Sequence, residues 1–377
     1  MASETNRGNL DRDGLAEFVA GDSRLATLRS AFAGSRAWLV GGSVRDLLLG
    51  RFPLDLDLVV EVDPTGLATG FGPDAVLHER FMTATLTIEG HSIDIARARS
   101  ERYPEPGALP EVEPASIEID LARRDFSINA IAVPLDRPND CVDPFDGLGA
   151  LAEGRLSLLH QDSLIDDPIR ALRGARYAAR FDFDPDPGME KALETVDLGS
   201  VSRDRFEAEL RRFGDEPDPA AALEIARRWG LIGISAEMIE SVRVAIGLLS
   251  EGAWEGFADR AELMLVACDP VDPVASIPTE PPKTRIEQSE LIGRTAPEAL
   301  VLARAAGREW LDWWPESGRA IDLEIDGEDL IAVGVEPGPQ VGAGLRTALA
   351  EALEVGGTDR ERQLETAVRA ARGEAGG

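Results

Sequence analysis

The sequence predicts an α/β head with a small mixed β-sheet, followed by a remainder that is almost entirely helical. Short apolar, strand-like runs occur between residues 36 and 96, where short helical patterns separate them. From residue 167 onward the apolar residues follow the period of about 3.6 residues that is typical of helices. The length of 377 residues is enough for two or three domains of roughly 100–200 residues.

The head is predicted to end near residue 160. Residues 1–30 are polar with a weak helical pattern, and we expect them to form a leader. The segment 103–114 contains four prolines and is predicted to be a surface loop. Strands are predicted at 37–40, 54–62, 83–88 and 92–96, and a short helix at 43–49, where Gly50 ends it.

The segments after the head are predicted to be helices joined by short loops. Ser235 is a plausible N-cap for its helix. The Pro- and acid-rich segment 269–284 is predicted to be a loop or linker. Helices are predicted at 167–180, 204–213, 219–229, 235–249, 261–266, 285–314 and 341–355.

Composition and charge limit the class of protein. Apolar residues make up 44% of the chain, and no apolar run approaches the roughly 18 residues of a membrane span. The start of the chain lacks a signal-peptide pattern, and only two cysteines occur, so we expect a cytoplasmic protein. The net charge of −30 argues against general affinity for nucleic acids. Any RNA binding must therefore depend on a local arginine surface.

The strongest motif is GGSVRDLLLGRFPLDLDLVV, residues 41–60. Asp55 and Asp57 alternate with leucines, so on a strand both carboxylates share one face while the leucines pack behind them. Two neighbouring carboxylates repel each other unless a cation neutralises them, and Mg²⁺ prefers such oxygen ligands. The whole motif therefore favours a magnesium site over the alternative, an exposed strand edge with two solvated aspartates.

Three further residues are expected at this site. Gly42 lets the backbone approach a ligand at the start of a helix, where free N–H groups can hold a phosphate. Arg45, in the first turn of that helix, could hold a triphosphate. Asp94 alternates with Ile93 and Ile95 on a predicted strand, so it could supply a third carboxylate if the two strands are neighbours.

Two arginine-bearing segments follow. In DLARRDFSINAIA, residues 120–132, the polar Arg124, Asp125 and Asn129 interrupt an apolar run, and the segment alone favours a structural salt bridge. In DDPIRALRGARYAARF, residues 166–181, four arginines fall within one stripe of about 120° on a helix. We expect an anion or a nucleotide as their partner, although acids elsewhere in this acidic chain could also pair with them. The four are Arg170, Arg173, Arg176 and Arg180.

Together these motifs resemble the class II tRNA nucleotidyltransferase family, which comprises CCA-adding, CC-adding and A-adding enzymes and bacterial poly(A) polymerases. The resemblance covers most of 36–230 and returns at 322–356. It implies a nucleotidyltransferase head in which Asp55 and Asp57 bind magnesium ions for nucleotidyl transfer from CTP and ATP to the 3′ end of tRNA. RRDFSINA resembles the ribose-recognition motif, which places Arg124 near the incoming nucleotide.

The resemblance also assigns the helix after the head. DDPIRALRGAR resembles the family's nucleobase motif, which implies that Asp167 and Arg170 pair with the base edges of CTP and ATP. It implies that Arg173 and Arg176 support the nucleotide. GEDLIAVGVEPGPQVGAGL resembles the tail region that holds tRNA. The implied organisation is a leader 1–30, a head 31–160, a neck 161–230, a body 231–290 and a tail 291–377.

Three departures from the family pattern occur. The neck motif begins Asp166-Asp167 instead of Glu-Asp, Ala150 replaces a usual acid, and no His-Asp phosphohydrolase signature follows the neck. The full-length loop 100–116 disfavours an enzyme that adds only CC. The loop leaves open A-only or poly(A) addition, and a catalytically silent RNA-binding or nucleotide-sensing protein is a remote alternative.

Overall fold

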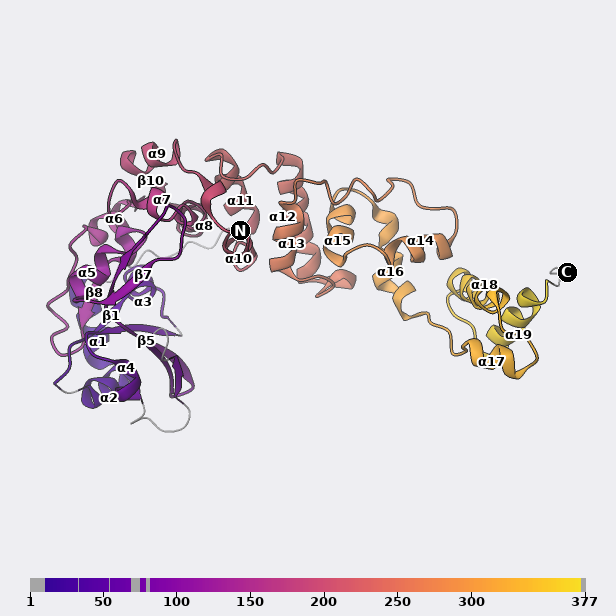
Figure 1. Cartoon of the computed structure of the whole chain (residues 1–377), viewed down its shortest axis with the longest axis horizontal. Helices are drawn as coiled ribbons and strands as arrows, with labels where there is room; N and C mark the ends of the chain where they lie inside the picture. Colours follow the sequence, from indigo (N-terminus) through magenta and orange to yellow (C-terminus); the bar gives the residue numbers. More distant parts are fainter. Residues whose placement is uncertain (1–10, 33, 54, 69–74, 79–81, 374–377) are drawn as a thin grey trace. The chain divides into compact units, whose positions relative to one another are not determined.

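The computed structural model describes residues 11–32, 34–53, 55–68, 75–78 and 82–373. The chain divides into two compact units, Met1–Glu209 and Leu210–Gly377. The strands lie in the first unit, coloured indigo to magenta in Figure 1, and the orange and yellow part of the chain is helical. This arrangement confirms the predicted fold class. None of the described helices has both the length and the apolar character needed to cross a membrane.

The first unit contains a six-stranded mixed sheet with the order β3-β4-β5-β2-β1-β8. The only parallel pair among the described strands of this sheet is β2–β5, and it sets Asp57 opposite Asp94. The two strands alternate as predicted, because Leu56, Leu58, Ile93 and Ile95 are buried behind these exposed aspartates. The strands are β1 Ala37–Val40, β2 Leu56–Val60, β3 Val76–His78, β4 Thr83–Ile88, β5 His91–Arg97 and β8 Ala132–Pro134.

Helices and short strands complete this unit. The strands expected at 37–40, 83–88 and 92–96 and the helix expected at 43–49 form with bounds close to the predicted ones. Leu54, predicted to begin a strand, lies outside the described residues. The helices are α1 Arg12–Gly21, α2 Ser23–Ala31, α3 Gly41–Leu48, α4 Pro64–Ala68, α5 Ile117–Ala122, α6 Gly147–Glu153, α7 Ser163–Asp166, α8 Ile169–Phe181, α9 Pro187–Leu193 and α10 Arg203–Arg211, which crosses the unit boundary. The short strands are β6 Arg99–Arg102, β7 Glu111–Pro114, β9 Arg155–Leu156 and β10 Asp184–Pro185.

Two expectations differ from the structure. Residues 12–30 of the expected leader lie in α1 and α2 and the single residue between them, and these helices bury Leu15 and Leu28 within the unit. Residues 1–10 lie outside the described part of the chain. The expected surface loop 103–114 is shorter than predicted, because its last four residues form β7 and pair with β6 in a hairpin. The exposed glutamates of β7 conceal its strand character in the sequence.

The second unit is built from helices joined by short loops. The Ser235 side chain caps α12 as predicted, and the segment 269–284 contains no helix or strand. Helices α18 and α19 pack so closely at Gly344 that no side chain would fit there. A Cβ at this position would lie 2.5 Å from the Ala367 carbonyl oxygen. The helices are α11 Pro219–Arg228, α12 Ala236–Ser250, α13 Arg260–Ala267, α14 Arg285–Ile292, α15 Pro297–Ala305, α16 Trp313–Glu316, α17 Gly327–Ala332, α18 Pro339–Val355 and α19 Arg360–Ala371.

Candidate active site

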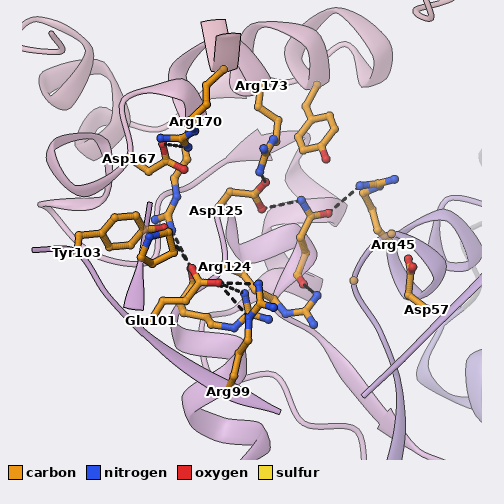
Figure 2. Close-up of a pocket in the computed structure, with 17 residues that line it drawn as sticks. Arg45, Asp57, Arg99, Glu101, Tyr103, Arg124, Asp125, Asp167, Arg170 and Arg173 are labelled. Carbon is orange, nitrogen blue, oxygen red and sulfur yellow. Dashed lines mark hydrogen bonds and ion pairs between the residues drawn. The ribbon is translucent and has the colours of Figure 1, made fainter. Parts of the chain in front are cut away.

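A polar cavity of about 520 Å³ opens in the first unit, between the sheet, the β6–β7 hairpin and helix α8. Figure 2 shows Asp57 and Arg45 on one side of it and Asp167, Arg170 and Tyr103 on the other. Most predicted site residues come together here, although Asp55, Asp94 and Arg176 are not among its lining residues. The predicted residues that line it are Gly42, Arg45, Asp57, Arg124, Asp167, Arg170 and Arg173.

Two carboxylates of the sheet lie side by side, and one of them, Asp57, lines the cavity. Asp57 and Asp94 occupy paired positions on the parallel strands β2 and β5, and Asp94 accepts a hydrogen bond of 2.6 Å from the Thr85 hydroxyl. Asp57 is open to the cavity, but the surrounding walls desolvate its carboxylate and raise its pKa; the charge of Asp94 raises it further, while Arg124 opposes both. Asp55 is exposed one position before β2, so it precedes the strand on which we expected it.

The glycine turn before α3 brings backbone and arginine side chains close to Asp57. Gly41 has a φ of 63°, and a Cβ there would lie 2.7 Å from Nη1 of Arg124, so this position requires glycine. A Cβ at Gly42 would lie 3.6 Å from Oδ2 of Asp57. Arg45 is buried, donates to Oδ1 of Asn129 at 2.7 Å and is held by its neighbour Asp46. These contacts hold the Arg45 guanidinium beside the Asp57 carboxylate.

The segment after α5 forms a buried charge network, as the sequence of that segment alone favoured. Asp120 is fully buried and accepts hydrogen bonds from Arg123 at 2.7 Å and Arg124 at 3.0 Å. Burial alone would raise the pKa of Asp120, but Arg124 and Arg123 lower it overall. Asp125 is likewise ionised, because Arg173 and Asn129 outweigh the effect of burial and lower its pKa. Arg124 also lines the cavity.

Asp167 and Arg170 line the opposite wall. Asp167 lies between α7 and α8 with backbone angles that are not helical, and its Oδ1 accepts a hydrogen bond of 2.8 Å from Arg205. Arg170 is 4% exposed and donates to the Ser163 hydroxyl at 2.6 Å and to the Arg123 carbonyl oxygen at 2.8 Å. Both side chains are therefore fixed before any ligand binds.

Two arginines of the α8 stripe are paired with acids, which is the alternative that the sequence left open. Arg173 donates to Asp125 at 3.1 Å, and Arg176 donates to Glu209 at 2.5 Å. For these two residues, acids of the protein are therefore partners. Arg173 still lines the cavity, whereas Arg176 is buried against Glu209.

Sequence reasoning missed several lining residues. Tyr103 donates to Glu101 at 3.1 Å, and its hydroxyl accepts from Arg170 at 3.4 Å. Burial raises the pKa of Tyr103 to about 12, so its hydroxyl stays protonated near neutral pH. No local pattern marks Glu101 and Tyr103, because the hairpin fold brings them to Arg170. The missed lining residues are Arg99, Glu101, Tyr103, Arg123, Tyr177 and Arg205.

The carboxylates at the cavity edge suit a hard divalent cation. Burial raises the pKa of Asp57, and repulsion from Asp94 at the paired position raises it further; a cation would relieve that repulsion. The described residues contain no cluster of three or more His, Cys, Asp or Glu side chains that could hold a metal ion. The pair therefore fits a cation that also takes oxygen ligands from a bound substrate, as Mg²⁺ does.

Known proteins with the same architecture identify the family. The Poly A polymerase head domain family matches residues 37–157. The CC-adding tRNA nucleotidyltransferase of Deinococcus radiodurans is 34% identical over 360 residues, which cover 88% of each chain. The A-adding tRNA nucleotidyltransferase of Halalkalibacterium halodurans is 41% identical over 52% of this chain and 50% of its own length.

Solved structures extend the likeness over nearly the whole chain. The Thermotoga maritima CCA-adding enzyme complexed with tRNA is 26% identical, with a TM-score of 0.71, and the match covers 96% of this chain and 98% of that one. A complex of a CCA-adding enzyme with CTP gives a TM-score of 0.73 at 26% identity, over 97% and 99% of the two chains. This chain therefore belongs to the class II tRNA nucleotidyltransferase family, and nucleotidyltransferases are generally metal-dependent.

Proposed function

We propose that this chain is a Mg²⁺-dependent cytoplasmic enzyme that adds CCA to the 3′ end of tRNA from CTP and ATP without a nucleic-acid template. The observation that carries the proposal is the single cavity that contains Asp57 on one wall and Asp167 and Arg170 on the other. Its volume of about 520 Å³ suits a nucleotide, because ligand pockets usually measure about 300–1,000 Å³. The transfer and the choice of base would then occur in one site.

Asp57, with Asp55 and Asp94, would hold the metal. Bound there, Mg²⁺ would neutralise charge on the triphosphate and favour ionisation of the primer hydroxyl. Arg45 and Arg124 would hold the triphosphate, with the glycine turn at Gly42 leaving room for the phosphate oxygens. The primer 3′-hydroxyl would lose its proton to water and its oxygen would bond to the α-phosphorus, while the bond from that phosphorus to the pyrophosphate oxygen breaks in line with it.

Asp167 and Arg170 would choose the base. Cytosine and adenine each present an amino group beside an unprotonated ring nitrogen on the edge used for base pairing. Asp167 would accept a hydrogen bond from the amino group, and Arg170 would donate one to the ring nitrogen. Uracil and guanine present a carbonyl oxygen and a ring N–H at the same places, so both interactions would be lost.

CC-only addition is the second candidate, because the Deinococcus radiodurans relative that matches over 88% of both chains carries that activity in its name. Complete CCA addition is favoured by the β6–β7 hairpin, whose Arg99, Glu101 and Tyr103 line the cavity. The resemblance noted for the loop 100–116 associates this element with enzymes that also add A. The hairpin would therefore be used in the last step, which is the addition of A.

Three primers separate the candidates. One tRNA ends at the base before CCA, the second ends in C and the third ends in CC. Each is incubated with one labelled nucleotide at a time. Complete addition predicts CTP incorporation into the first two and one ATP into the third. CTP incorporation without any ATP incorporation would show a CC-adding enzyme. One ATP added to the third primer, with no CTP incorporation into the first two, would show an A-adding enzyme, and long A tails would show a poly(A) polymerase. No incorporation into any primer would contradict the proposal.

A further inference from the structure

The tip of the β6–β7 hairpin is tied to Asp167 by one arginine. Arg205, on α10, donates from Nη2 to Oδ1 of Asp167 at 2.8 Å and from Nη1 to the Gly107 carbonyl oxygen at 2.8 Å. The Gly107 N–H in turn donates to the Asp166 carbonyl oxygen at 3.2 Å. The hairpin tip, the arginine and the expected base-reading carboxylate thus form one connected set of contacts.

The docking of the hairpin tip depends on glycine. Gly107 has a φ of 72°, in the left-handed region, and a Cβ at this position would lie 2.6 Å from the Ser200 carbonyl oxygen. Any larger residue would therefore both strain the backbone and push the tip away from Ser200. The carbonyl oxygen that binds Arg205 would move with it.

The contact also determines how Asp167 can interact with a ligand. Asp167 lies at the junction of α7 and α8, where φ is −138° and ψ is 88°, so a regular helix does not orient its side chain. Arg205 occupies Oδ1, and among the described residues no hydrogen bond to Oδ2 is found. Oδ2 is thus the oxygen available to accept a hydrogen bond from a base in the cavity.

We propose that Arg205 is a positioning residue that determines base specificity. It orients Asp167 toward the base amino group and makes that orientation depend on the docked hairpin tip. This inference rests on the proposed function, in which Asp167 reads the base. If Arg205 only stabilised the fold, its loss would lower the stability of the protein and reduce the use of every nucleotide by the same factor.

The first test compares Arg205→Ala, Arg205→Lys and a control, Arg203→Ala. Arg203 lies on the same helix, pairs with Glu207 and has a side chain that is 88% exposed, so the control removes the same charge outside the cavity. The measured quantity is the ratio of kcat/KM for CTP to kcat/KM for UTP on tRNA that lacks CCA. Loss of a charged hydrogen bond predicts that this ratio falls by about tenfold or more in Arg205→Ala.

The lysine variant and the control make the result specific. Lysine retains the charge but not the two-pronged geometry, so Arg205→Lys should recover only part of the discrimination. Arg203→Ala should discriminate as the wild type does. An unchanged CTP-to-UTP ratio in Arg205→Ala, or equal losses for both nucleotides, would overturn the inference.

The second test asks whether the hairpin tip acts through Arg205. Gly107→Val should also lower the CTP-to-UTP ratio, and the double variant should lose less than the product of the two single losses. Gly107→Ala serves the same purpose if the valine variant fails to fold, as judged by its circular dichroism melting curve. Losses that multiply would show that the tip and Arg205 act independently, which contradicts the coupling.

Asp167→Ala separates this inference from the proposed function. Unchanged discrimination in that variant would contradict the assignment of Asp167 as the base reader. Impaired discrimination in Asp167→Ala together with normal discrimination in Arg205→Ala would overturn only the positioning role of Arg205.

Discussion

At the scale of single residues, the alternation of aspartates with buried leucines and isoleucines determines the candidate metal site. Leu56 and Ile93 are completely buried, which turns Asp57 and Asp94 to the same face of neighbouring strands. The sequence predicted this face for each strand but not that the strands are neighbours. The parallel pairing of β2 with β5 supplies that information, and it makes Asp94 a stronger candidate for the third carboxylate.

Asp94→Asn should raise the Mg²⁺ concentration needed for half-maximal incorporation, because one charged oxygen donor is lost. We expect kcat/KM to fall by about tenfold or more at a fixed, low Mg²⁺ concentration. Binding of Mn²⁺, followed by its electron paramagnetic resonance signal, should weaken in parallel. Asp63→Asn is the matched control, since Asp63 is an exposed carboxylate just beyond β2. A wild-type metal requirement in Asp94→Asn would remove Asp94 from the site.

At the scale of elements, α5 is anchored by one buried carboxylate. Asp120 receives hydrogen bonds from two arginine side chains and from the Arg99 backbone N–H, and so it holds the start of β6 against α5. Removal of one partner from a buried ion pair costs about 3 kcal/mol or more of unfolding free energy. Asp120 therefore stabilises both the β6–β7 hairpin and the position of Arg124 at the cavity.

The effect of Asp120→Asn on stability should depend on pH. The arginines lower the pKa of Asp120 below its ordinary value of 3.8. A lowered pKa contributes stability that is present above 3.8 and is lost as the pH falls through the folded-state pKa. The melting temperature of the variant should thus lie well below that of the wild type at pH 7, and the gap should narrow below pH 3.8. An equal gap at both pH values would contradict this account.

Helices and strands with a clear period were predictable, whereas contacts between distant segments were not. The alternation in β2 and β5 and the cap at Ser235 are local patterns, and the structure has them where expected. The partners of Arg173 and Arg176 lie 48 and 33 residues away in sequence, so a helical stripe could not reveal them. Strand β7 was missed because its two glutamates and its final proline do not form an apolar strand pattern.

At the scale of the whole molecule, the acidic surface limits how tRNA can be held. Between residues 41 and 230 there are 21 basic and 37 acidic residues, so even this half of the chain carries a net charge of −16. The structure reduces the number of available cations further, because Arg173 and Arg176 are paired with acids. We therefore expect tRNA to contact few arginines and many backbone N–H groups, including those near Val341.

A weak dependence of tRNA binding on salt should follow, because each neutralised phosphate adds only about −0.9 to the slope of log affinity against log salt on a duplex. The enzyme should remain active at potassium chloride concentrations that inhibit a basic RNA-binding enzyme. The measurement is a titration of tRNA affinity against potassium chloride. A slope steeper than about −5 would mean more than about five neutralised phosphates and would refute this picture.

The central claim is that one cavity in the first unit transfers both C and A. The most direct test is the incorporation of CTP and of ATP by Asp57→Asn, each on its own primer, with Asp63→Asn as the control. Asp57→Asn should lose both activities by at least about a hundredfold, because Asp57 is the cavity-lining carboxylate of the metal site. Its melting temperature should not fall, since a repelling carboxylate has been neutralised. Near wild-type incorporation of either nucleotide by a folded Asp57→Asn protein would contradict the claim.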